Sequence, residues 1–351
     1  MSDALAVAAE ILEVDQVEQV AELGGSRRSV VRRVRAGAET YIVKEYLTPE
    51  DMTWRREAAG LEAADGVRAP RLLGVSEDPT IVVMSDLGTG SNVADLLLSA
   101  DAQAAGAGMV AWAEAIGEMQ RHTTGRLDVF REALGDGIRA DATAAEIETI
   151  ARHLRERAAK SDLPWSESVP DALTEAMEPL LAETDQALTP GDPCPDNNLV
   201  GPDGLTLLDF EFAEIRHRAW EGAYLHVPWP SCWCCWQVPD GWAGKALGTY
   251  VDATYGSAGP PSTFERDLDL ATLLWCIQST TWFLVGALQD GLEYNLDDDR
   301  MPGRRTIVLS RLDLVTRTAG PEPLLTWAAD VRKELAARWQ DRPLRMAPAF
   351  R

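Results

Sequence analysis

Three oxygen-bearing side chains in one short region have the types and the spacing needed to hold a divalent cation. Asp192 is followed five residues later by Asn197, and Asp209 stands twelve residues further on, at the end of the apolar stretch LTLLD. Carboxylate and amide oxygens suit Mg²⁺, which usually takes one or two carboxylates together with water and phosphate oxygens. Asn197 and Asp209 meet that description. The remaining carboxylate, Asp192, is a candidate to orient or deprotonate an attacking hydroxyl group.

The backbone that carries Asp192 and Asn197 is predicted to be a stiff loop. Pro190, Pro193 and Pro195 each lack an N–H and fix their own φ, so this segment cannot be an ordinary helix. A stiff loop holds its side chains in place before a substrate arrives. The alternative is structural, because Asp and Asn in a proline-rich turn often do no more than hydrogen-bond their own backbone.

The elements around this loop predict an α+β fold with a small strand-rich lobe, residues 1–90, and a larger helical lobe, residues 91–351. In the first lobe, the residue pattern predicts helices at 3–13 and 49–64 and strands at 17–23, 29–37, 40–47, 71–75 and 80–87. In the second lobe, apolar periodicity predicts helices at 103–121, 143–159, 171–187, 262–290, 304–318 and 322–339. An island rich in Pro and Gly, residues 189–212, interrupts these helices and carries the loop.

The charge balance disfavours two classes of partner. The chain has 33 Lys and Arg against 56 Asp and Glu, a formal net charge of -23. Such a charge repels phosphate backbones and anionic lipids, so we expect no nucleic-acid and no membrane binding, while cationic small molecules are favoured. With 46% apolar residues, the chain is expected to be folded.

A cytoplasmic location is predicted. The first fifteen residues carry acids where a secretory signal would carry basic residues, and five cysteines are too few for a disulfide framework in a chain of this size. The most apolar window, residues 270–288, has the length of a membrane span, but four polar residues, 278–281, lie at its middle. We interpret it as a buried helix.

The order Asp-x-x-x-x-Asn followed by Asp-Phe-Glu resembles the aminoglycoside phosphotransferase and choline kinase family, which has a two-lobed protein-kinase-like fold. The resemblance covers about residues 17–225. It implies that Asp192 is the catalytic base or hydroxyl-orienting residue and that Asn197 and Asp209 hold Mg²⁺. It also implies ATP or GTP as the phosphoryl donor and a hydroxyl group of a small molecule as the acceptor.

Motifs in the first lobe match the same family in the expected order. Lys44, in YIVKEY, resembles the lysine that contacts the α- and β-phosphates, and Glu57 resembles its ion-pair partner. The turn expected between the first two strands resembles the phosphate-covering loop and contains Gly24, Gly25 and Ser26. The segment that leaves the last strand resembles the hinge that binds the nucleotide base and contains Met84, Ser85 and Asp86.

Two departures from the family pattern leave the acceptor class open. Pro190 stands where the family has His, so the anchoring of the loop must come from another residue or from the proline itself. Glu221-Gly222-Ala223 stands where the family has Asp-Leu-Ala.

The residues that follow Asp209 supply candidate acceptor contacts. The acids Glu211, Glu214 and Glu221 are solvated surface groups by default, but they would become ammonium partners if the substrate were a polyamine. The cysteines of the Cys-Trp block at 229–236 lack the paired spacing that is usual in zinc sites. A zinc site there would need Cys194, His217 or His226 as further ligands. Core packing is the favoured interpretation. An aromatic wall of the substrate pocket is the alternative, formed by Trp229, Trp233 and Trp236.

Together these features predict an O-phosphotransferase that acts on a small hydroxylated molecule, with a cationic acceptor as one option. An aminoglycoside-like or other sugar-containing antibiotic is the first choice of acceptor. The alternatives are a metabolite kinase of the choline, homoserine or sugar type, and a non-catalytic nucleotide-binding protein on the same fold. A monomer or a homodimer is expected.

Overall fold

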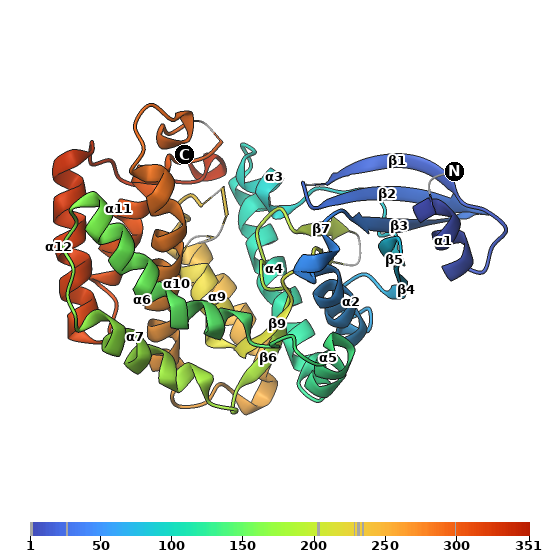
Figure 1. Ribbon diagram of the computed structural model, residues 1–351, viewed down its shortest axis with the longest axis horizontal. Coiled ribbons are helices and arrows are strands. Elements are labelled where there is room, and N and C mark those ends of the chain that lie inside the picture. Colours follow the sequence, from blue (N-terminus) through green and yellow to red (C-terminus); the bar gives the residue numbers. More distant parts are fainter. Residues whose placement is uncertain are drawn as a thin grey trace.

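The computed structural model describes residues 3–25, 27–201, 204–227, 229, 232–233, 235–298 and 300–351. A strand-rich lobe and a helical lobe lie on opposite sides of the molecule, with helix α4 (Ala102–Thr123) between them (Figure 1). The mixed α+β architecture predicted from the sequence is confirmed. The domain boundary near residue 90 stays a prediction.

One antiparallel sheet forms the frame of the first lobe. Its strands follow the spatial order β1-β2-β3-β5-β4, so the last two cross over in sequence. Their bounds are Glu18–Gly25 for β1, Ser29–Ala36 for β2, Glu39–Tyr46 for β3, Leu72–Glu77 for β4 and Thr80–Ser85 for β5. Two helices accompany the sheet, α1 (Asp3–Ile11) and α2 (Thr53–Ala64).

The alternation of side chains along β5 explains why a helix packs on each face of this sheet. Ile81 and Val83 belong to a small core with the apolar residues of α1. Val82 and Met84 point to the other face and belong to the main core, which includes Leu61 of α2. Because successive side chains of a strand face opposite sides, a strand that is apolar on both faces needs two covers.

The phosphate-covering turn differs from its prediction. Gly24 and Gly25 lie inside β1, paired with Val31 and Val30 of β2, and an irregularity in the register precedes them. Glycines tolerate such irregular pairing because they lack a side chain. Gly24 and Gly25 are therefore strand residues, and Ser26 lies outside the described residues.

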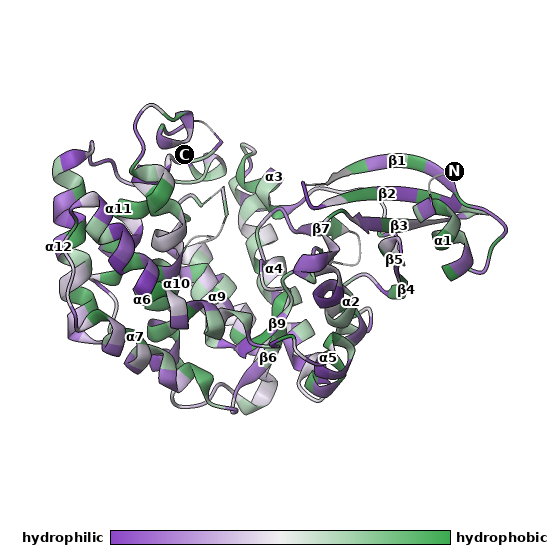
Figure 2. Cartoon of the chain, viewed as in Figure 1, coloured by the Kyte–Doolittle hydropathy of each residue, from purple (hydrophilic) through white to green (hydrophobic). Residues whose placement is uncertain are grey.

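Helices dominate the second lobe. They are α3 (Val93–Leu97), α4 (Ala102–Thr123), α5 (Leu127–Leu134), α6 (Ala142–Ser161), α7 (Val169–Met177), α8 (Ala219–His226), α9 (Asp240–Tyr255), α10 (Phe264–Ala287), α11 (Arg304–Val315) and α12 (Glu322–Arg338). Hydrophilic and hydrophobic residues alternate along α6, α11 and α12 (Figure 2), as expected for helices with one buried face. The sequence did not predict α3, α5, α8 or α9.

One predicted helix, 171–187, is too long. Helix α7 ends at Met177, a 3-10 turn follows, and residues 186–189 form strand β6 (Gln186–Thr189) instead. This strand pairs with β9 (Glu214–His217), so a partner about thirty residues away decides its conformation.

The apolar window is a buried helix, as predicted. It forms α10, the one helix in the described part of the chain that is long and apolar enough to cross a membrane, and 78% of its most apolar window is buried inside the protein. Burial by neighbouring helices explains its composition.

Candidate active site

A cavity of about 600 Å³ collects most of the residues predicted to bind nucleotide and metal. Strands β2, β3 and β5 and the segment after β5 line one side, and the loop after β6 with the residues after β8 (Gly204–Leu207) lines the other. The residues predicted to bind nucleotide and metal that line it are Lys44, Glu57, Met84, Ser85, Asp86, Asn197 and Asp209. Glu211 was predicted as an acceptor contact, but it lines this cavity and not the small one that contains Asp192.

Lys44 lies at the centre of a buried cluster of carboxylates. Its Nζ is 2.8 Å from Glu57 Oε2, 2.7 Å from Asp209 Oδ1 and 3.2 Å from Glu211 Oε2. Burial disfavours the charged amine, but the negative charges of these three partners outweigh burial and raise the pKa of Lys44. The amine is therefore cationic at neutral pH, which suits a phosphate contact. Glu57 also accepts a hydrogen bond from the hydroxyl of Tyr46.

Local backbone geometry brings Asn197 and Asp209 to the same side of this cavity. Strands β7 (Asn198–Gly201) and β8 form a two-stranded hairpin, and the N–H of Leu208 donates to the carbonyl of Asn197 over 2.9 Å. Asp209 then adopts the left-handed region, with φ of 60°, which Asp tolerates better than most residues. Asn197 Nδ2 donates to the carbonyl of Asp192 over 2.9 Å, so its Oδ1 remains as the acceptor.

These donors fit a hard divalent cation. Asp209 offers a half-buried carboxylate and Asn197 an amide oxygen, which is the ligand set that Mg²⁺ accepts beside phosphate oxygens. The neighbouring carboxylate of Glu211 adds negative charge, although Arg28 pairs with it at 2.5 Å. Burial and the charge of Asp209 raise the pKa of Glu211.

Asp192 faces a different cavity. It lines a smaller space of about 320 Å³ together with Phe212, Trp275 and Trp282. The thiol of Cys194 donates to Asp192 Oδ1 at 3.3 Å, and burial raises the pKa of this thiol, so it stays protonated at neutral pH. The loop therefore presents Asn197 to one cavity and Asp192 to the other.

A model of the phosphotransferase enzyme family matches residues 19–255, about two thirds of the chain. The chain belongs to this family. The resemblance seen in the sequence motifs is thereby confirmed, and the protein is a small-molecule phosphotransferase. None of the curated proteins matches its sequence.

Two solved structures illustrate the fold that this phosphotransferase shares with other proteins. A choline kinase from Cryptosporidium parvum Iowa II matches with a TM-score of 0.56 at 11% identity, over 91% of this chain and 93% of that chain. A Plasmodium vivax ethanolamine kinase matches with a TM-score of 0.50 at 12% identity, over 88% and 84%. At these identities the likeness concerns the fold alone.

Thr189 anchors the loop that carries Asp192, next to Pro190, which stands where the family resemblance would place a histidine. Its Oγ1 accepts from the N–H of Gly191 over 3.1 Å and donates to Glu221 Oε1 over 2.6 Å. Gly191 has φ of 85°, and a side chain there would meet the backbone of Phe212. Only glycine allows this close approach.

Glu221, predicted as a substrate contact, is instead part of a buried ion network. It is 0% exposed, and its Oε1 is 2.5 Å from Arg216 Nη2. Arg216 also pairs with Glu214 at 3.1 Å, and Glu214 accepts from both the N–H and the hydroxyl of Thr143. The position of Glu221 under the loop favours a structural role, because a buried, paired carboxylate cannot reach an acceptor.

The tryptophans at 229, 233 and 236, predicted as the alternative to form an aromatic wall of the substrate pocket, do not line the small cavity that contains Asp192. Trp229 and Trp236 are each 1% exposed; the ring of Trp229 packs on Trp112 and Tyr224, and Trp236 donates to the carbonyl of Arg300. Trp233 is partly exposed, but it donates to Asp196 and does not line the small cavity. The favoured packing interpretation therefore holds for Trp229 and Trp236. Cys234 of the same block lies outside the described residues.

The sequence did not predict the aromatic residues that line the small cavity beside Asp192. Trp275, Gln278 and Trp282 lie on one face of α10 at helical spacing, and Glu146 of α6 accepts from Gln278 Nε2 at 2.6 Å and Trp282 Nε1 at 2.5 Å. The polar residues in the middle of the apolar window were the available signal. Asn198 was also missed: its Oδ1 accepts from the N–H of Val93 over 3.0 Å and so fixes the loop to α3.

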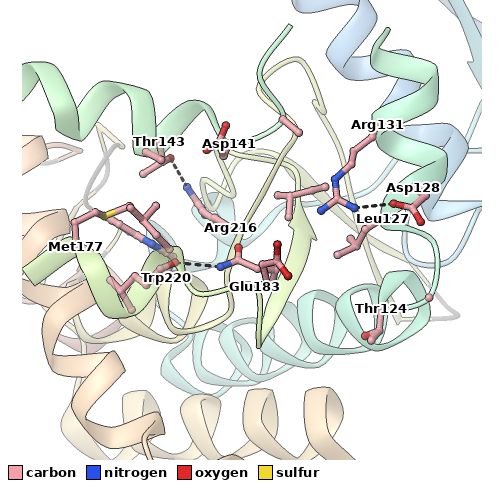
Figure 3. Close-up of a pocket in the computed structure, with 17 residues that line it drawn as sticks. Thr124, Leu127, Asp128, Arg131, Asp141, Thr143, Met177, Glu183, Arg216 and Trp220 are labelled. Atoms are coloured by element: carbon pink, nitrogen blue, oxygen red, sulfur yellow. Dashed lines mark hydrogen bonds and ion pairs between the residues drawn. The ribbon is translucent and has the colours of Figure 1, made fainter. Parts of the chain in front are cut away.

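A larger cavity of about 760 Å³ is lined by residues of the helical lobe, among them Asp128, Glu183 and Arg216 (Figure 3). Thr143 and Arg216 line both this cavity and the small one, so they form part of the wall between them. The larger cavity contains no predicted catalytic or metal residue. Its volume alone therefore does not identify it as the active site.

Glu221→Gln is expected to destabilise the phosphotransferase by about 3–5 kcal/mol, because Arg216 would lose one of its two carboxylates without gaining solvent. Urea denaturation followed by circular dichroism measures this loss. Glu183→Gln changes an exposed acid of the larger cavity and should alter the free energy of unfolding by less than about 0.5 kcal/mol. Equal stability of the two variants would contradict the buried network.

Proposed function

We propose that the protein transfers the γ-phosphoryl group of ATP or GTP to a hydroxyl of a small molecule. The observation that carries the proposal is the loop between the two cavities. Asn197 and Asp209 line the larger of these two, beside Lys44, and Asp192 lines the smaller. In-line phosphoryl transfer needs the attacking oxygen of the acceptor and the leaving oxygen of the donor on opposite sides of the transferred phosphorus. One cavity on each side of the loop that carries Asp192 and Asn197 supports that arrangement.

The chain's own residues have separate tasks in this proposal. Lys44 and the β1–β2 hairpin hold phosphates, and backbone groups near Met84 and Asp86 bind the base. Asn197 and Asp209 hold Mg²⁺, which when bound neutralises charge on the β- and γ-phosphates. Asp192 orients the acceptor hydroxyl and takes its proton. Positioning and charge stabilisation provide most of the rate in such transfers.

The small cavity favours a compact cationic acceptor. Aromatic side chains of Phe212, Trp275 and Trp282 line it beside the carboxylates of Asp192, Glu146 and Glu214. Two arginines line it as well: Arg216 is paired with Glu214 and Glu221, and Arg56 donates to backbone carbonyls. Glu146 is held by two neutral donors, which leave its negative charge available for an ammonium group. Aromatic rings and carboxylates together attract organic cations.

The volume of the small cavity limits the size of the acceptor group that can enter it. A space of about 320 Å³ suits an amino alcohol such as choline or a single aminosugar ring. We therefore place a hydroxylated organic cation first. A sugar-containing antibiotic of the aminoglycoside type remains the second candidate, bound through one aminated ring with the rest outside the cavity.

A panel of acceptors tests the proposal. ATP and GTP consumption with Mg²⁺ is measured with choline, ethanolamine, homoserine, neutral sugars, aminoglycosides and spectinomycin. Turnover with a cationic acceptor, and none with neutral sugars, is the expected result. A thermal shift with ATP and Mg²⁺ but no turnover with any acceptor would instead favour a non-catalytic nucleotide-binding protein.

Glu146→Gln is expected to raise KM for a cationic acceptor about tenfold with little change in kcat, because one charge-assisted contact is lost from ground state and transition state alike. Steady-state kinetics against acceptor concentration measures the effect. Glu148→Gln, on the exposed face of the same helix, is the matched control and should leave KM unchanged. An unchanged KM in Glu146→Gln would remove Glu146 from the acceptor site.

A further inference from the structure

We propose that Cys194, Cys232 and Asp196 form a binding site for one soft divalent cation such as Zn²⁺. The two sulfur atoms and a carboxylate oxygen of Asp196 all lie within 4.8 Å of one another. Tetrahedral zinc places such donors about 3.5–3.8 Å apart, so little movement is required. The site is separate from the oxygen ligands Asn197 and Asp209.

The two thiols reach each other from distant segments, each held by its own backbone. Cys194 stands between Pro193 and Pro195 in the catalytic loop, and its N–H donates to the carbonyl of Asp192 over 2.8 Å. Cys232 N–H donates to the carbonyl of Trp229 over 3.0 Å, and the ring of Trp229 is anchored in the aromatic core. Both thiols are buried. This arrangement fixes two of the donors before any ion arrives.

Asp196 is oriented by a neighbour in the way that metal-ligating carboxylates usually are. Trp233 Nε1 donates to Asp196 Oδ2 at 2.8 Å, and Asp196 Oδ1 lies 3.6 Å from Cys232 Sγ. One oxygen is thus held by the indole while the other faces the thiols. Outer partners of this kind fix the direction of a ligand and strengthen metal binding.

Thiolate ligands select the metal. Sulfur donors prefer Zn²⁺ and other soft ions, whereas Mg²⁺ requires oxygen ligands in octahedral geometry. Binding exchanges protons for metal: the ion takes two thiolates, two protons leave to solvent, and water completes the fourth position. Excess Mg²⁺ should therefore not compete for this site.

A metal ion bound at Cys194, Cys232 and Asp196 should change the hydrogen bonding of the loop that carries Asp192. Cys194 donates its thiol hydrogen to Asp192 Oδ1, and a metal-bound thiolate has no hydrogen to donate. Asp192, which is proposed to orient the acceptor, would lose the hydrogen bond from the thiol of Cys194, and the sulfur atom would move toward the metal. We expect Zn²⁺ to lower turnover even when Mg²⁺ is saturating.

Cobalt serves as the spectroscopic probe of binding. Reduced protein in excess Mg²⁺ is titrated with Co²⁺, and one equivalent should produce the thiolate-to-cobalt charge-transfer absorption together with tetrahedral d–d bands; Zn²⁺ should then abolish them. Cys232→Ser should lower the affinity for Co²⁺ at least about a hundredfold. Cys276→Ser, which changes a buried cysteine of α10 outside the cluster, should bind as the wild type does.

Three further measurements complete the test. Trp233→Phe keeps all three ligands but removes the indole donor, and should weaken Co²⁺ binding about tenfold. Inhibition by Zn²⁺, expressed relative to each variant's own rate, should be lost in Cys232→Ser and kept in Cys276→Ser. Circular dichroism establishes that each variant is folded. No charge-transfer band at millimolar Co²⁺, or an undiminished band in folded Cys232→Ser, would overturn the site.

Discussion

Asp192→Asn is expected to lower kcat about a thousandfold while KM for nucleotide and acceptor changes little. The amide keeps the size of the side chain and can still accept from Cys194, so the loop should hold its shape. It cannot accept the proton of the acceptor hydroxyl. General-base catalysis contributes roughly 10²–10⁴ to the rate of such reactions, and a residue that acts only in the transition state changes kcat rather than KM.

A carboxylate in the same loop provides the matched control for Asp192→Asn. Asp196 lines the cavity of Asn197 and Asp209 rather than the small one, so Asp196→Asn should retain kcat within about fivefold when soft metals are chelated. Steady-state rates at saturating ATP, Mg²⁺ and acceptor measure both variants. A kcat for Asp192→Asn within tenfold of the wild type would mean that another group receives the proton.

Asp209→Asn is expected to lower kcat by about 10³ and to raise the Mg²⁺ concentration needed for half-maximal rate. The substitution removes the one carboxylate that shares the proposed metal position with Asn197, and also a charge 2.7 Å from Lys44 Nζ. Loss of a single preorganised electrostatic contact typically lowers rates by 10²–10³. Asn tolerates the left-handed backbone that Asp209 adopts, so the fold should survive.

The metal titration separates this prediction from a general loss of activity. Rates of Asp209→Asn are measured over a wide range of Mg²⁺ and compared with those of Glu45→Gln. Glu45 is a partly exposed carboxylate on β3 that pairs with Arg32. The control should keep the Mg²⁺ dependence of the wild type. Wild-type turnover of Asp209→Asn at ordinary Mg²⁺ concentrations would remove the proposed mechanism.

The elements with strong local signals could be predicted from the sequence. Periodicity placed the five strands of the first lobe and the long helices α4, α6, α10, α11 and α12, because each has an apolar pattern of sufficient length. Short helices such as α3 and α8 carry too few residues to show a period. Strand β6 was assigned to a helix because its pairing partner lies far along the chain.

The candidate site was also predicted only in part. The sequence identified candidate groups for the chemistry, since Lys44, Asn197 and Asp209 stand in an ordered set of motifs, and the structure places all three around one cavity. Spacing along a chain does not tell which side chains face the same space, so Asp192 and the aromatic residues of α10 met only in the folded protein.

The sequence by itself determined the family and the mixed α+β architecture, and it identified the candidate phosphate- and metal-binding groups, because local patterns and residue types specify these. The tertiary structure decided which carboxylates are buried in ion pairs and which line a cavity. Glu221 lies under the loop with Arg216, whereas Glu146 faces the small cavity. It also decided that Cys194 meets Cys232. Burial and long-range contact depend on how helices and strands pack, and no short stretch of sequence encodes that packing.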